Sequence, residues 1–173
     1  MDLRYKIKEI PPEGRPVVTS LSQPLLADAL EAVHCDVAQS EAKLEGSLIP
    51  MDGGIYLQGK LGGVLGLFCS RCLQPAQVAL DLSLHTIFTR DSAEEQEDPK
   101  EDVDYVQFEG DIIDLAPMLR EQLILAAPMA PLCSLTCLGL CSICGKDRNR
   151  EACQHEEEAS ASRFSVLKSM KLG

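Results

Sequence analysis

The chain contains no tryptophan, and only 4% of its 173 residues are aromatic. A hydrophobic core must therefore be built from aliphatic side chains, which the 45% hydrophobic content supplies. Long hydrophobic runs are also missing: those at 61–68 and 123–127 fall far short of the roughly 20 residues of a membrane-spanning helix. Residues 1–8 alternate apolar and charged side chains without a hydrophobic signal region. We expect a cytoplasmic protein without a membrane segment.

Motifs of the common enzyme classes are missing as well. The sequence has no Gly-X-Gly-X-X-Gly, Walker loop, Gly-X-Ser-X-Gly or His-Glu-X-X-His. His34 and His85 have no partner at a ligand spacing, and the lone Cys35 is interpreted as a small core residue. We predict no catalytic residue and no small-molecule substrate, and hence a protein that is not an enzyme.

The formal charge of −11 is concentrated in two short stretches. Eight acids and one base lie between Asp91 and Asp104, and Glu156–Glu158 adds three more acids. The remainder of the chain is close to neutral. We interpret both stretches as solvated segments, and the first as an acidic loop at 91–104.

Short alternating segments from residue 42 onward predict an antiparallel β meander. Strands are expected at 43–49, 55–60, 64–68 and 78–89, with turns at 52–54 and at Gly62-Gly63. In the last strand Val78, Leu80, Leu82 and Leu84 share one face, as in a sheet with one buried side. An edge strand is predicted at 3–7 and a short strand at 105–108, whereas 26–33 fits either helix or strand.

The strongest helix signal covers residues 111–125. Asp114 is the expected N-cap, and Pro117 then lies in the first turn, where no backbone hydrogen bond is lost. The predicted apolar stripe consists of Leu115, Leu119 and Leu123, widened by Met118 and Leu125. A short C-terminal helix is expected at 162–171.

Eight cysteines in a chain without an export signal indicate metal ligands rather than disulfides. The pattern is Cys-X2-Cys at 69–72, Cys-X3-Cys at 133–137, Cys-X2-Cys-Gly at 141–145 and Cys-X-His at 153–155. Two intervening residues let both sulfurs of a tight turn reach one ion, and zinc takes four such ligands. The candidate zinc ligands are Cys69, Cys72, Cys133, Cys137, Cys141, Cys144, Cys153 and His155.

These eight ligands fill two structural zinc sites. The favoured pairing joins Cys69/Cys72 to Cys133/Cys137, and Cys141/Cys144 to Cys153/His155. The rival arrangement is a single site of Cys69/Cys72 with Cys141/Cys144. A redox Cys-X-X-Cys is less favoured, because no thioredoxin-like βαβ pattern surrounds either pair.

The expected fold class is α+β. An antiparallel β meander is followed by a helix, a cysteine-rich zinc knuckle and a short C-terminal helix. Residues 1–131 form a β-rich domain with the packed helix and the acidic loop. Residues 132–173 form the zinc knuckle and tail, docked on the first part.

The cysteine motifs and their surroundings resemble the YceD family. Cys69-Ser-Arg-Cys-Leu-Gln-Pro75 is similar to that family's "CxRCL-x-P" element, and 111–131 to its second block. The segment 133–145 resembles the third, cysteine-rich block, and 163–170 the closing segment. Where most relatives with the third block have Cys-X-Cys, this chain has Cys153-Gln154-His155.

The resemblance implies a non-catalytic bacterial factor in synthesis, processing or stability of 23S ribosomal RNA. We expect a ribosomal or RNA-processing protein as partner, attracted by the acidic loop. Direct RNA contact through Lys146, Arg148 and Arg150 beside the third block is a weaker prediction. The alternatives are a zinc-thiolate redox sensor or chaperone, and a hydrolase with an incompletely filled zinc site.

Overall fold

The computed structural model describes residues 3–31, 37–90 and 103–153. Its body is one five-stranded sheet with strand order β2-β3-β4-β5-β6. The strands are β2 (Arg15–Ser20), β3 (Glu41–Met51), β4 (Gly54–Phe68), β5 (Pro75–Thr89) and β6 (Asp104–Gln107). Neighbours from β2 to β5 are antiparallel, which confirms the meander, and β6 is parallel to β5.

The turn predicted at Gly62-Gly63 is wrong, because β4 continues through both glycines. Gly63 pairs with Ala42 in β3 and with Leu80 in β5. A β-carbon at Gly63 would overlap the backbone carbonyl oxygen of Glu41. The glycine is therefore explained by the close approach of β3, and the two strands predicted at 55–60 and 64–68 are one.

A second, two-stranded sheet joins the beginning of the chain to a segment near residue 113. The predicted N-terminal strand is β1 (Arg4–Lys6), and it pairs with β7 (Ile112–Asp114). Short 3-10 helices follow at Ile7–Glu9 and Val37–Gln39. The segment predicted as either helix or strand, 26–33, is helical as far as Leu30, within α1 (Gln23–Leu30), which buries Leu26, Ala29 and Leu30.

The predicted helix begins slightly later than expected, as α2 (Ala116–Ala126). Leu115 is its N-cap, so the expectation that Asp114 is the N-cap is wrong. Asp114 ends β7 instead, and its Oδ1 accepts the backbone N–H of Ala116 at 2.9 Å. Pro117 lies in the first turn, as predicted.

The apolar stripe of α2 faces the core, with one exception. Leu119 and Leu123 are fully buried, and Met118 is nearly so. Leu125 is 78% exposed and does not belong to the buried face. Its position lies away from the stripe because it follows Leu123 by only two residues.

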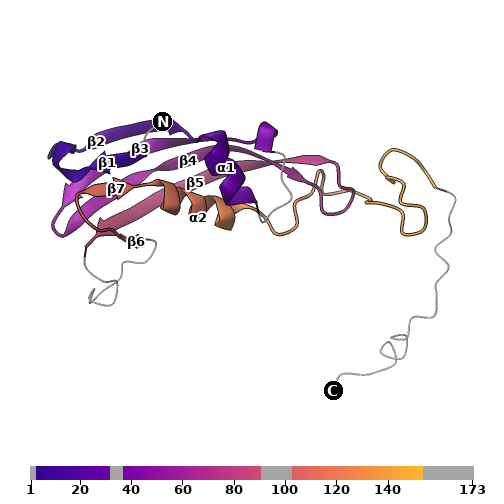
Figure 1. Cartoon of the computed structure of the whole chain (residues 1–173). Coiled ribbons are helices and arrows are strands. Elements are labelled where there is room, and N and C mark those ends of the chain that lie inside the picture. The colour runs from indigo at the N-terminus through magenta and orange to yellow at the C-terminus, as the bar shows by residue number, and fades with distance from the viewer. Residues whose placement is uncertain (1–2, 32–36, 91–102, 154–173) are drawn as a thin grey trace, which may run out of the picture.

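Both helices cover the same face of the sheet, and the core lies between the two layers (Figure 1). The side of β5 that carries Leu80 and Leu84 contributes to this core, as predicted. At the far end of the β4–β5 hairpin the chain extends beyond both helices, and the segment after α2 returns there (Figure 1). That end holds the cysteines.

Several predictions fall outside the described residues. They are most of the acidic loop, His155, the Cys35 region and the C-terminal helix at 162–171. Within the described ranges, no helix is long and apolar enough to cross a bilayer. The boundary at 131/132 stays a prediction.

Candidate metal centres

Four cysteine sulfurs converge at the end of the β4–β5 hairpin. Cys69 and Cys72 come from the turn between those strands, whereas Cys133 and Cys137 follow α2. The four Sγ atoms all lie within 4.8 Å of one another. The Cys69–Cys137 sulfur distance is 3.8 Å, and the Cys72–Cys133 distance is 3.5 Å. A tetrahedron with metal–sulfur bonds of about 2.3 Å has sulfur–sulfur edges of about 3.8 Å. The cluster therefore has the dimensions of a four-thiolate metal site.

The turn at Cys69 is shaped by two backbone hydrogen bonds. The Cys69 N–H donates to the Gln74 carbonyl at 2.8 Å, and the Leu73 N–H donates to the Cys69 carbonyl at 2.9 Å. Leu73 adopts a left-handed conformation with φ of 61°, the one positive φ among the described non-glycine residues. The turn aims the backbone N–H groups of Arg71 and Cys72 at the Cys69 sulfur.

The pKa values of Cys69 and Cys133 are shifted in opposite directions. Burial raises the pKa of Cys69, but backbone N–H groups from Cys133, Cys72 and Arg71 outweigh it and lower the pKa to about 6. Hydrogen bonds to the Cys72 and Cys137 sulfurs raise the pKa of Cys133 to about 12. Several thiolates this close repel one another, and a divalent cation removes that repulsion.

A second cluster consists of Cys141, Cys144 and Cys153, whose sulfurs also lie within 4.8 Å of one another. Cys141 is buried, Cys153 is half-buried and Cys144 is exposed. The fourth predicted ligand, His155, lies outside the described residues. The second group is therefore more open to solvent than the first.

The turn of the second cluster repeats the turn of the first. The Cys141 N–H donates to the Lys146 carbonyl at 2.8 Å, and the Gly145 N–H donates to the Cys141 carbonyl at 2.9 Å. Gly145 has a φ of 71° and occupies the position that Leu73 holds in the first turn. Backbone N–H groups of Cys144 and Ile143 lower the pKa of Cys141 to about 7. In both turns, backbone N–H groups thus lower the pKa of the first cysteine and favour its thiolate form.

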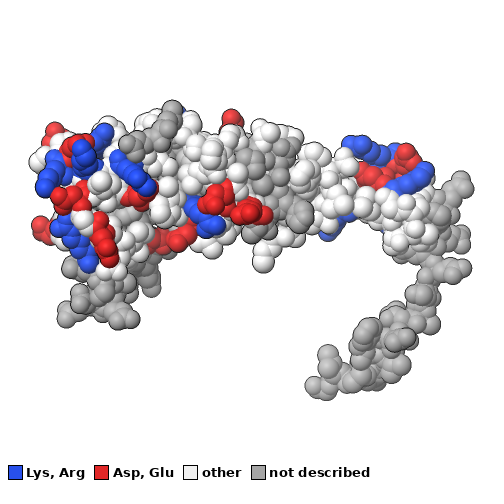
Figure 2. All heavy atoms as spheres, in the orientation of Figure 1, with Lys and Arg blue, Asp and Glu red and all other residues white. Residues whose placement is uncertain are grey.

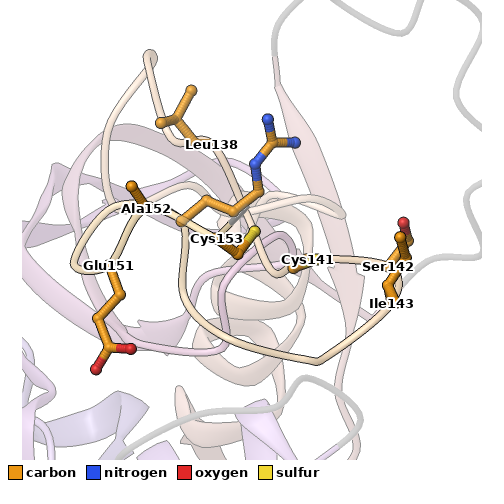
Figure 3. Close-up of a pocket in the computed structure, with 8 residues that line it drawn as sticks. Leu138, Cys141, Ser142, Ile143, Glu151, Ala152 and Cys153 are labelled. Atoms are coloured by element: carbon orange, nitrogen blue, oxygen red, sulfur yellow. The ribbon is translucent and has the colours of Figure 1, made fainter. Parts of the chain in front are cut away.

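Beside the second cluster lies a shallow hollow of about 230 Å³. Its lining residues are Leu138, Cys141, Ser142, Ile143, Arg148, Glu151, Ala152 and Cys153. In Figure 3 the Cys153 sulfur lies centrally beside Cys141, with Ser142 and Ile143 at one edge and Glu151 pointing away. Leu138 and Ile143 are 59% and 61% exposed, so the hollow has an apolar margin.

The bases predicted to contact RNA lie in this same segment. The Lys146 Nζ is 2.8 Å from a Glu151 carboxylate oxygen. Arg150 donates to the Gln74 side chain at 2.9 Å and lies 3.7 Å from the Asp147 carboxylate. Acidic neighbours thus offset the positive charges of Lys146 and Arg150.

The structure groups the cysteines as the favoured pairing requires, with Cys141 and Cys144 separate from the first four. Metal ligation itself stays a prediction. Two supporting residues were not predicted: Arg71, whose guanidinium donates to the Cys137 carbonyl at 2.9 Å, and Asn149. Asn149 is the chain's one asparagine, but no spacing rule connects it to a cysteine.

Comparison with known proteins gives one match. The family described as "Large ribosomal RNA subunit accumulation protein YceD" matches residues 57–171, about two thirds of the chain and both cysteine clusters. Neither a curated protein nor a solved structure matches. The cysteine clusters support assignment to a cysteine-rich branch. The chain belongs to the YceD family.

Proposed function

We propose that this chain is a non-catalytic factor that supports synthesis, processing or stability of 23S ribosomal RNA, and that its cysteine clusters hold structural zinc. The family match carries the first part of the proposal. The four-sulfur cluster carries the second.

Zinc suits the first cluster on three grounds. The donors are all thiols, the sulfur–sulfur distances fit a tetrahedron, and backbone N–H groups stabilise the thiolate of Cys69. Four protein ligands leave no open position for a substrate or a catalytic water, which makes the role structural. The ion would hold the hairpin end against the segment after α2.

A protein partner is favoured over naked RNA by the surface of the cysteine end, residues 69–74 and 131–153. Large apolar side chains are exposed there: Leu73 is 63% exposed, Leu135 90% and Ile143 61%. Apolar exposure of this kind is typical of protein contact sites. On the face shown in Figure 2, basic and acidic side chains lie side by side at this end.

The family role is tested by depletion and complementation in the native cell. Loss of the chain should lower the ratio of 23S to 16S ribosomal RNA, and the wild-type chain should restore it. Cys72→Ser should fail to restore it, whereas the matched control Cys35→Ser, outside the paired spacings, should succeed. An unchanged ratio after depletion would refute the proposed role.

The metal is tested by elemental analysis of reduced protein purified without added metal. We expect about two zinc ions per chain, and a reproducible value near zero would refute the metal sites. Thiol titration before and after peroxide separates a structural role from a redox sensor. Activity that depends on peroxide-driven zinc release would favour the sensor or chaperone instead.

The partner class is tested through the acidic loop. We propose that it steers a basic ribosomal or RNA-processing protein toward the chain. Replacing Glu94, Glu95, Glu97 and Asp98 with serine should reduce co-purification of such proteins without lowering the melting temperature. Tight, sequence-selective binding to naked 23S RNA that survives these changes would show that RNA is the primary partner.

A further inference from the structure

The two cysteine clusters are connected by hydrogen bonds as well as by the short segment 138–140. The Leu140 N–H donates to the Arg71 carbonyl at 3.1 Å, which joins the residue before Cys141 to the first turn. The Arg148 N–H donates to the Gly139 carbonyl at 3.0 Å. The loop of the second cluster therefore folds back against the first.

Asn149 makes the most direct of these connections. Its Nδ2 donates to the Cys137 sulfur at 3.5 Å, and its Oδ1 accepts the Leu138 N–H at 2.9 Å. The other Nδ2 hydrogen goes to the Asp147 carboxylate at 2.7 Å. A residue from the second loop thus contacts a sulfur of the first cluster, and its amide is held on three sides.

The position of Asn149 depends on the loop that carries it. That loop, 141–153, has a cysteine of the second cluster at each end and local turns, with no helix or strand, between them; a β-bridge from Asp147 to Leu140 ties it to the preceding segment. A metal bound to Cys141, Cys144 and Cys153 would close the loop. Closure removes much of the conformational freedom that otherwise opposes placing the amide on Cys137.

We propose that Asn149 couples the two metal sites, so that metal in the second cluster tightens binding in the first. This inference rests on the proposed metal function of the clusters. An N–H donated to a ligand sulfur stabilises the thiolate and fixes its orientation, and loss of such a supporting residue costs about ten- to hundred-fold in metal affinity. Because coupling is reciprocal, metal in the first cluster tightens the second by the same factor.

The test uses cobalt(II) as the probe and the reduced, metal-free full-length chain. Thiolate-to-cobalt absorption reports binding, and its intensity distinguishes a four-thiolate site from one with fewer thiolates. Affinity at the first site is measured in the wild type, Asn149→Ala, Cys144→Ser and the double variant. Gln122→Ala is the matched control, because its amide donates to Asp104 at 2.9 Å, away from both clusters.

We expect Asn149→Ala and Cys144→Ser each to weaken the first site about ten- to hundred-fold. The double variant should be no weaker than the weaker single variant, since both changes remove the same contact. Gln122→Ala should bind like the wild type. Asn149→Asp keeps the oxygen that accepts from Leu138 but loses the donor to sulfur, and it should be at least as weak as Asn149→Ala.

Unchanged first-site affinity in Asn149→Ala would overturn the coupling. So would losses from Asn149→Ala and Cys144→Ser that multiply in the double variant. If two cobalt ions bind independently, the coupling fails but the metal function stands. If the wild-type chain binds no cobalt, the metal function fails, and the coupling with it.

Discussion

The first cluster should act as a cross-link between the sheet and the segment after α2, and Cys72→Ser tests this. Cys72 is 1% exposed, and its sulfur lies 3.5 Å from that of Cys133. Removing either thiol removes one of four ligands and opens the link. The two single variants should therefore be equally destabilised, and the double variant should be no worse than either.

The expected loss of stability in Cys72→Ser follows from the length of the chain segment that the cross-link closes into a loop. Sixty residues lie between Cys72 and Cys133. Closing a loop of that length in the unfolded chain costs about 4 kcal/mol by the chain-entropy relation used for disulfides. For a protein of this size, such a loss lowers the melting temperature by roughly 8–16 °C.

Cys144→Ser provides the comparison. Only eight residues lie between Cys144 and Cys153, and the loop they close is outside the sheet. A tenfold loss of metal affinity at the first site corresponds to about 1.4 kcal/mol of stability. The melting temperature of Cys144→Ser should therefore lie roughly 3–6 °C below that of the wild type.

The assay is thermal unfolding of zinc-loaded protein, followed by circular dichroism of the β-sheet. A chelator should lower the wild-type melting temperature to that of Cys72→Ser and leave Cys72→Ser itself unchanged. Equal losses for Cys72→Ser and Cys144→Ser, or additive losses for Cys72→Ser and Cys133→Ser, would refute the cross-link.

Three further predictions concern the fold. Leu73→Gly should raise the free energy of unfolding, measured by chemical denaturation, by about 1 kcal/mol, because glycine adopts the left-handed conformation without strain. The same change should weaken partner co-purification. A loss of stability would contradict this prediction. Gly63→Ala should destabilise the fold by about 1–3 kcal/mol, because the new β-carbon would overlap β3. Gly62→Ala is the control and should be tolerated, because a β-carbon there meets its nearest atom at 3.8 Å. Equal effects of the two changes would contradict this prediction. The Lys8 ammonium lowers the pKa of Asp111 by hydrogen bonding and by its charge, so Asp111 stabilises the fold above its unfolded-state pKa and loses that effect as pH falls through the lowered value. The melting temperature of Asp111→Asn should therefore lie below that of the wild type at pH 7 and converge with it in acid, and a constant gap would refute the assignment.

Local patterns predicted much of this molecule. Alternation in 78–89 predicted β5 and its buried face, because side chains in a strand point alternately to opposite sides. The apolar stripe at Leu119 and Leu123 predicted α2 for a similar reason. The Cys-X2-Cys spacings predicted that the two sulfurs within each such motif come together, since two intervening residues suffice to aim a pair at one point.

Other features depend on residues far apart in the chain. Gly63 has a turn-like sequence but lies in a strand, and only the proximity of Glu41 explains it. β6 is parallel to β5, and no alternation pattern distinguishes a parallel from an antiparallel neighbour. Asp114 carries a capping side chain, yet pairing with Arg4 in β1 keeps it in a strand.

The candidate metal site likewise has features that local sequence predicts and features that depend on residues far apart in the chain. The sequence by itself places the two sulfurs of each Cys-X2-Cys motif together, because both cysteines lie within one short turn. Which motifs meet was decided by the tertiary structure, which brings Cys133 and Cys137 to Cys69 and Cys72. The support of the first cluster by Asn149 was decided only by the tertiary structure, since the folded loop brings its amide to the Cys137 sulfur. Hydrogen bonds from side chains require no fixed sequence spacing, and they form wherever folding places a donor beside an acceptor.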